Sequence, residues 1–86
     1  MSEEQIGKIS HYFGHIHVAA VELTDGALAV GDNIHIKGHT TDLSEEVKSI
    51  EIEHERVASA KQGESIGITV PDHVREHDVV YKVVAD

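Results

Sequence analysis

Glycine turns that separate short runs of β-branched residues restrict the fold of this chain more than any other feature. The stretch VGDNIHIKGHTTD places a turn at Gly31 and Asp32, follows it with Ile34 and Ile36, and ends the alternation at Gly38. Because side chains alternate between the two faces of a strand, both isoleucines point to one face. Glycine also tolerates the positive φ that tight turns require. The pattern therefore predicts a hairpin turn that leads into a half-buried strand.

Four more segments have the same β-branched and aromatic character, and we expect strands at residues 6–13, 15–23, 65–70 and 79–84. The segment 42–60 is ambiguous. Leu43, Val47 and Ile50 have the spacing of an amphipathic helix, with Asp42 in a position to cap it. The run Ile50 to Glu53 instead alternates with period two, which is typical of a strand. Periodicity alone leaves both interpretations open.

The length of 86 residues, with one proline and no internal repeat, predicts an N-terminal tail at residues 1–5 and one domain at residues 6–84. The chain has no cysteine, which excludes disulfides, thiolate metal sites and a thiol nucleophile. The first residues, MSEEQ, are acidic where a signal peptide is basic. No apolar run approaches the ~18 residues of a membrane span. We therefore expect a cytoplasmic protein with no membrane contact.

The charge balance is strongly acidic. Asp and Glu number 16 against 7 Lys and Arg, which gives a net charge of −9, and protonating all 8 histidines leaves the chain negative. Binding to nucleic acid depends largely on Lys and Arg displacing counterions, so RNA would need a local basic patch. Solvated acidic groups that keep a small domain soluble are the alternative explanation of this charge.

Several motifs together resemble a known family. They are IGKISHYFGHIHVAAVEL, LAVGDNIHIKGHTTD, VKSIEIEH, AKQGESIGI and VREHDVVYKV, which cover residues 6–83 in order. In this order they resemble the small stand-alone translation elongation factor-like proteins, and through them the second domain of elongation factor Tu and other translation GTPases. A related barrel also occurs as the C-terminal domain of collagenase-like peptidase-family proteins.

The resemblance implies a fold and a set of structural residues. The fold is all-β, a six-stranded antiparallel Greek-key β-barrel, which would make residues 47–54 a strand. The residues that mark its turns and close backbone contacts are Gly31, Asp32, Gly38, Gly63 and Gly67. The GTPases' glycine-rich and basic loop falls on Gly14 to Val21, where His15 replaces the basic residue. The phosphate-binding motif G-x-x-x-x-G-K-[ST] is absent from the sequence, so we expect no nucleotide binding, no GTPase activity and no cofactor.

Two groups of side chains are candidates for binding. The candidate RNA-contacting residues are Lys37, His39, Arg56, Arg75 and Tyr12, which would gather at one rim of a barrel with the tyrosine stacking a base. His15 and His17 lie two residues apart, a spacing at which two imidazoles on a strand can share a metal ion. Exposed histidines without a metal are the more ordinary interpretation, and we expect no metal site.

Gly63 to Gly67 spells G-E-S-I-G, which matches the nucleophile elbow of α/β-hydrolases, but that elbow requires a strand-to-helix turn in a much larger sheet. We therefore expect no enzyme. The functional prediction is a non-catalytic module of the translation-factor type, associated with RNA or a ribonucleoprotein. The alternative is an acidic protein-interaction adaptor that docks on a partner enzyme. The sequence does not fix the oligomeric state.

Overall fold

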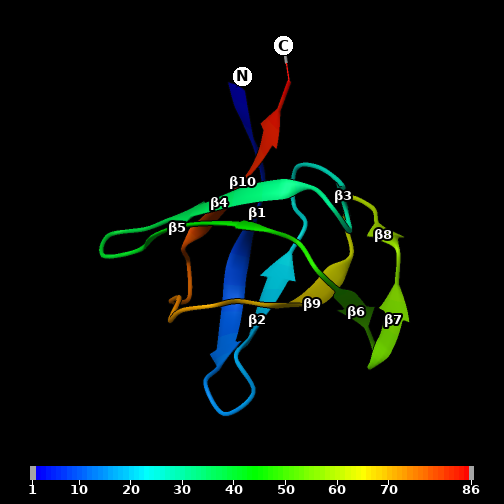
Figure 1. Cartoon of the computed structure of the whole chain (residues 1–86), viewed down its shortest axis with the longest axis horizontal. Helices are drawn as coiled ribbons and strands as arrows, with labels where there is room; N and C mark the ends of the chain where they lie inside the picture. The colour runs from blue at the N-terminus through cyan, green and yellow to red at the C-terminus, as the bar shows by residue number, and fades with distance from the viewer. Residues whose placement is uncertain (1, 86) are drawn as a thin grey trace.

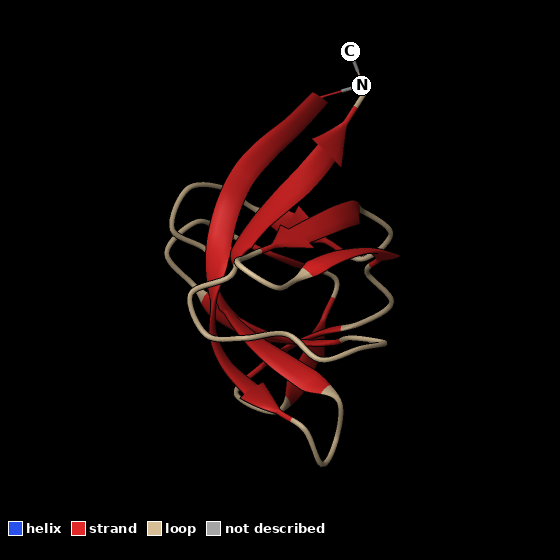
Figure 2. Cartoon of the chain, turned by 90° about the vertical axis from the view of Figure 1, so that its left-hand side faces the viewer, coloured by secondary structure: helices blue, strands red, loops and turns tan. Residues whose placement is uncertain are grey.

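The computed structural model describes residues 2–85, and this part of the chain consists of strands, turns and loops without a helix (Figures 1 and 2). Residues 2–85 accordingly contain no helix with the length and apolar character of a transmembrane segment. The strands are β1 (Ser2–Phe13), β2 (Val18–Glu22), β3 (Leu28–Ala29), β4 (Asn33–Lys37), β5 (Asp42–Glu46), β6 (Ile50–Ile52), β7 (Glu55–Val57), β8 (Ser59–Ala60), β9 (Ser65–Thr69) and β10 (Val79–Val84). The expected all-β fold is confirmed.

Eight of the strands form one sheet in the order β5-β4-β10-β1-β2-β9-β6-β7, and β3 pairs with β8 in a separate two-stranded sheet. All of the pairs are antiparallel, as expected. The large sheet wraps around a common interior (Figure 2). It ends at β5 on one side and β7 on the other, so the sheet as described is not closed into a barrel.

The ambiguous segment 42–60 is extended. β5 pairs with β4, and β6 pairs with both β7 and β9. Leu43 and Val47 lie on one face of an extended chain, and the irregular residues 48 and 49 then shift the alternation so that Ile50 faces the core as well. A helix-like spacing thus arises from two strands with a break between them. Of the single strand expected at residues 47–54, only residues 50–52 are a strand, β6, and residues 53 and 54 form the turn that leads to β7.

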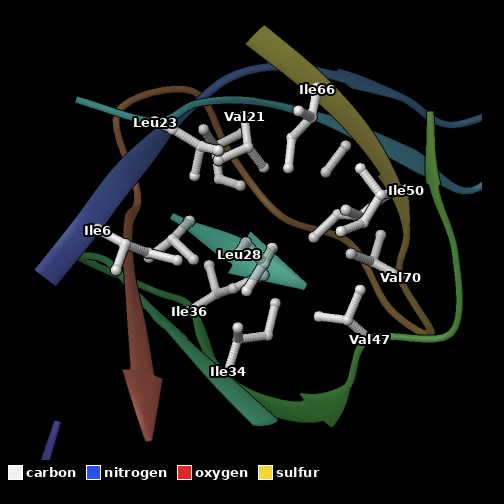
Figure 3. Packing of buried hydrophobic residues seen from close by; sticks show 14 of the residues in the cluster. Ile6, Val21, Leu23, Leu28, Ile34, Ile36, Val47, Ile50, Ile66 and Val70 are labelled. Carbon is white, nitrogen blue, oxygen red and sulfur yellow. The ribbon is translucent and has the colours of Figure 1, made fainter. Parts of the chain in front are cut away.

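The core is formed by the inward-facing side chains of the strands and their connecting loops. Ile34 and Ile36 both point inward, as their alternation predicts. Burying an aliphatic side chain of this size stabilises the fold by roughly 1.5–3 kcal/mol. Figure 3 shows side chains from β1, β2, β4, β6 and β9 meeting in the shared interior. The buried apolar residues are Ile6, Ile9, Ala19, Val21, Leu23, Leu28, Ile34, Ile36, Val47, Ile50, Ala60, Ile66, Ile68, Val70, Val74 and Val80.

The segment expected as an N-terminal tail is part of β1. Ser2 to Gln5 pair with Val84 to Tyr81 of β10, and the two strands project from the body as a two-stranded ribbon (Figure 1). Met1 lies outside the described residues. The side chains of residues 2–5 are exposed. A protruding strand can therefore have the same polar, acidic sequence as an unstructured tail.

The signature residues occupy turns and close contacts. Gly31 and Gly63 have φ of 96° and 97°, a region that glycine adopts at little cost. Asp32 closes its turn, because its carboxylate accepts a hydrogen bond from the Ala29 amide at 2.9 Å. At Gly38 a β-carbon would lie 1.8 Å from Asp78 Oδ1, so the chain passes that buried carboxylate too closely for a side chain.

Candidate functional site

The outer face of strands β2, β9 and β6 carries a shallow trough, which we take as the candidate site. Its floor lies where the register pairs Ala20 with Gly67 and Gly67 with Glu51. Ala19, Ile66, Ile68 and Ile50 point from the same strands into the core, so alternate residues face outward. Two neighbouring outward positions therefore hold a methyl group and a hydrogen atom, which leaves the sheet surface hollow between larger side chains.

One wall of the trough is apolar. Phe13 and Ile16, at the turn between β1 and β2, are 46% and 63% exposed, and both line the trough with Val18. Exposed apolar side chains of this size commonly mark interaction sites when they line a concave surface. The Phe13 ring is held edge-on against the ring of His11 at a centroid separation of 4.5 Å, which orients this wall.

The opposite wall is acidic and comes from β6 and the turn that follows it. Glu51, Glu53 and His54 line this side, and the hollow between the two walls measures about 320 Å³. Glu53 and His54 have φ of 51° and 68°, a left-handed conformation that costs energy for residues other than glycine. Asparagine and glycine are the residues that two-residue hairpin turns of this kind favour. The strained turn therefore places two large polar side chains, Glu53 and His54, at the trough, where asparagine and glycine would offer smaller groups.

The candidate RNA-contacting residues lie on several elements of the structure. Lys37 ends β4, and His39 lies in the β4–β5 turn at the left of Figure 1. Arg56 lies on β7, at the lower right of the same view and directly opposite Glu51 in the register. Tyr12 and Arg75 line a separate hollow with Glu76. Gly38, between Lys37 and His39, lies against the Asp78 carboxylate, and this carboxylate also accepts a hydrogen bond from the Arg75 amide at 2.9 Å.

Tyr12 makes contacts within the protein. Its side chain is partly buried against the core, and its ring lies edge-on to the His73 ring at a centroid separation of 4.6 Å. Phe13 is the outward-facing member of the adjacent aromatic pair. His15 and His17 are both exposed at the β1–β2 turn. Residues 2–85 contain no group of three or more His, Cys, Asp or Glu side chains placed to hold a metal ion.

A second polar feature, away from the trough, is a clasp of Glu3, His35 and Asp42. His35 Nδ1 lies 2.8 Å from Glu3 Oε2 and Nε2 is hydrogen-bonded to the Asp42 carboxylate, so both ring nitrogens donate when the imidazole is protonated. These hydrogen bonds, first to Asp42 and then to Glu3, raise the pKa of His35 above its ordinary value of 6.5. The hydrogen bond from His35 in turn lowers the pKa of Asp42. The clasp fastens the protruding end of β1 to the β4–β5 hairpin.

The clasp makes stability depend on pH. The raised pKa of His35 means that its contribution is complete below 6.5 and is lost as the pH rises through the folded-state value. The contribution of Asp42 runs the other way: it is present above 3.8 and is lost on acidification. We expect His35→Gln to lower the melting temperature by several degrees at pH 6 and by much less at pH 9. An equal loss at both pH values, measured by circular dichroism, would show that His35 acts through packing alone.

No protein-family model matches the chain. A protease of Methanocaldococcus jannaschii, described as uncharacterized, is 42% identical over 78 residues, which are 90% of this chain and 19% of that protein. A collagenase of Porphyromonas gingivalis is 37% identical over 78 residues, covering 90% of this chain and 22% of the collagenase. Elongation factor 1-alpha of Natronomonas pharaonis is 37% identical over 70 residues, covering 77% and 16%. The chain spans about a fifth of the length of these relatives.

A solved structure has the same fold. The C-terminal domain of a Geobacillus thermoleovorans protein assigned to the U32 peptidases superimposes with a TM-score of 0.86 at 15% identity, covering 94% of this chain and 93% of that one. A selenomethionine variant of the same domain gives a TM-score of 0.84, also at 15% identity, covering 90% and 96%. At this identity the likeness establishes the fold alone.

These matches correct the family and functional predictions. The relatives with the higher coverage are a protease and a collagenase, and the elongation factor matches over less of the chain. The prediction of a translation-factor family is therefore wrong, and so is the prediction of an RNA-associated module that rested on it. The matching segment of each relative is one part of a longer protein, and the alternative of an adaptor for a separate partner enzyme stays a prediction. The VGD and GES turns specify an architecture, which several functions share.

Sequence reasoning did not identify the trough. Gly67 was expected only as a position where backbones pack closely. A β-carbon added at Gly67 would instead have a single neighbour within 4 Å, Val18 Cγ1 at 3.4 Å, so the space outside this glycine is open. Ala20, Gly67 and Glu51 meet only through strand pairing. The one local signal was the pair of apolar residues Phe13 and Ile16 on either side of an expected turn.

Proposed function

We propose that this chain is a peptidase-type accessory domain that binds a segment of polypeptide in the trough and does not cleave it. The trough is the observation that carries the proposal, because it combines exposed Phe13 and Ile16 with a floor of Ala20 and Gly67. The similarity to a protease and a collagenase supports a polypeptide as the bound molecule. A hollow of about 320 Å³ lies at the lower end of the range for ligand sites, which suits one or two side chains.

The surroundings of Ser65 support a non-catalytic role. The G-E-S-I-G sequence lies in the turn before β9, and Ser65 is the first residue of that strand. The chain continues into Ile66 and Ile68, which are buried in the core, instead of into a helix. A nucleophile elbow needs the strand to precede the serine and a helix to follow it. The order here is a turn followed by a strand.

The proposal extends to the architecture and the location. Segment 42–52 pairs with β4 through β5 and with β9 through β6. One continuous stretch of chain thus pairs with both ends of the strand series β4-β10-β1-β2-β9, and counted as a single strand it is the sixth. This double pairing supports a six-stranded Greek-key barrel that closes through the bend between β5 and β6. We retain the cytoplasm as the proposed location.

Gly67→Val tests the proposed function. We expect valine to project into the trough and block it while strengthening β9, because glycine weakens a strand interior and φ at Gly67 lies outside the left-handed region. The probes are fluorescein-labelled collagen peptides and reduced, iodoacetamide-alkylated lysozyme, both unfolded. The wild-type protein should raise the anisotropy of at least one probe and leave it uncleaved on gels. Gly67→Val should weaken binding about tenfold or more.

Thr69→Val is the matched control, since it adds the same side chain two residues further along the outer face of β9, outside the trough. This variant should bind like the wild type. Equal binding by Gly67→Val and wild type would refute the trough as the site, and cleavage of either probe would refute the non-catalytic role.

A further inference from the structure

We infer that the trough selects an extended segment in which a large apolar residue is directly adjacent to a lysine or arginine. This inference rests on the proposed function and specifies its ligand. The two walls differ in chemistry: Phe13, Ile16 and Val18 form one, and Glu51 and Glu53 contribute two carboxylates to the other. A ligand that satisfies both walls at once must present an apolar group to one side and a cation to the other.

The carboxylates of the acidic wall form no close ion pair among residues 2–85. Within residues 2–85, neither Glu51 nor Glu53 has a basic group within 4.0 Å in an ion pair, although Arg56 lies opposite Glu51 in the register. The net charge of −9 adds a background potential that attracts cations. Polypeptide segments that carry Lys or Arg are thus favoured over acidic ones before any contact forms.

The width of the trough sets the spacing of the ligand residues. From Phe13 on β1 to Glu51 on β6 the sheet advances three strands, through β2 and β9. At about 4.8 Å per strand this separation is roughly 14 Å, enough for one extended backbone with a side chain on each side. A chain that runs parallel to β2 and β9, over the floor of Ala20 and Gly67, points successive side chains to opposite walls. Residues i and i+1 therefore face different walls, whereas residues i and i+2 face the same wall.

Two peptides of identical composition test this spacing. Acetyl-Gly-Gly-Leu-Lys-Gly-Gly-amide has the apolar and basic residues adjacent, and acetyl-Gly-Leu-Gly-Lys-Gly-Gly-amide separates them by one residue. We expect the adjacent form to bind about three- to tenfold more tightly in isothermal titration at low salt, as one well-placed partly exposed ion pair allows. Replacing its lysine with glutamate should abolish measurable binding.

Glu51→Gln combined with Glu53→Gln should remove the preference for the adjacent lysine and leave a weak, salt-insensitive affinity for leucine. The control is Glu4→Gln combined with Glu46→Gln, which changes the net charge equally on the exposed ribbon and on β5, outside the trough lining. This control should keep the preference.

The outcomes separate the two proposals. If both peptides bind equally and Gly67→Val abolishes binding of both, the spacing inference is wrong and the trough remains a polypeptide site. If Gly67→Val leaves binding of both peptides unchanged, the proposed function fails and the inference fails with it. Retention of the preference in the Glu51→Gln/Glu53→Gln protein would overturn the role assigned to the acidic wall.

Discussion

Replacing Gly7 with alanine is expected to destabilise the domain by about 3 kcal/mol and to lower its melting temperature by roughly 12 °C or more. A β-carbon at Gly7 would lie 2.1 Å from the carbonyl oxygen of Glu22 and 3.2 Å from the Cα of Leu23. All of these neighbours are backbone atoms of β2 and the residue after it, so no side chain can rotate away. Strands β1 and β2 would have to separate in the middle of the sheet.

Gly14→Ala is the matched control. The nearest atom to a β-carbon at Gly14 would be Tyr12 Cε2 at 3.5 Å, an ordinary contact with a side chain. We expect its free energy of unfolding to stay within about 0.5 kcal/mol of the wild type. Urea unfolding followed by circular dichroism measures both variants, and a Gly7→Ala protein as stable as Gly14→Ala would show that β1 and β2 are not packed as described.

Replacing Glu45 with leucine is expected to stabilise the domain by about 2 kcal/mol at pH 8. Glu45 lies on the inner side of β5, between Leu43 and Val47, and its Oε1 is buried without a hydrogen-bond partner among the described residues. Burial raises the pKa of Glu45 from 4.5 to about 7. At pH 8 the folded protein therefore holds the Glu45 charge in partly apolar surroundings. Because the side chain is partly exposed to solvent, this charge lowers the free energy of unfolding by only about 1–2 kcal/mol.

The sign of the pH dependence follows from the raised pKa of Glu45. Below pH 4.5 the carboxyl is neutral in both states and imposes no electrostatic penalty. The penalty grows as the pH rises toward about 7 and is complete above that value. The gain from Glu45→Leu should thus be several degrees larger at pH 8 than at pH 4.5.

Glu46→Leu, on the outer side of the same strand, provides the control and should change the melting temperature little at either pH. A Glu45→Leu protein that melts below the wild type at pH 8 would contradict the assignment of Glu45 to the inner side.

The strands could be predicted because their signals are local. The alternation of Ile34 and Ile36, and the turns at Gly31 and Gly63, depend on a few neighbouring residues. In segment 42–60 the spacing of the apolar residues suggested a helix that is not there. The break after β5 shifts the alternation of inward and outward side chains, and two strand patterns shifted in this way have the same spacing as part of a helix. Only pairing with β4 and β9 resolves this segment.

The trough could not be predicted for the opposite reason. Ala20, Gly67 and Glu51 lie on strands far apart in sequence, and none of them is unusual alone. The basic residues are easier to notice in the sequence, and the structure places Arg56 on β7 and Lys37 at the end of β4. The shared strand and turn pattern also gave the wrong family, because an architecture used by several protein classes does not report which molecule is bound.

The most direct test of the trough is an NMR titration of the ¹⁵N-labelled protein with acetyl-Gly-Gly-Leu-Lys-Gly-Gly-amide. Binding in the trough should shift the backbone amide signals of Ala20, Gly67 and Glu51 and leave those of His35 and Asp42, at the clasp, in place. Saturable shifts confined to the trough would support the account. Shifts centred on the β4–β5 hairpin, or no shifts at millimolar peptide, would contradict it.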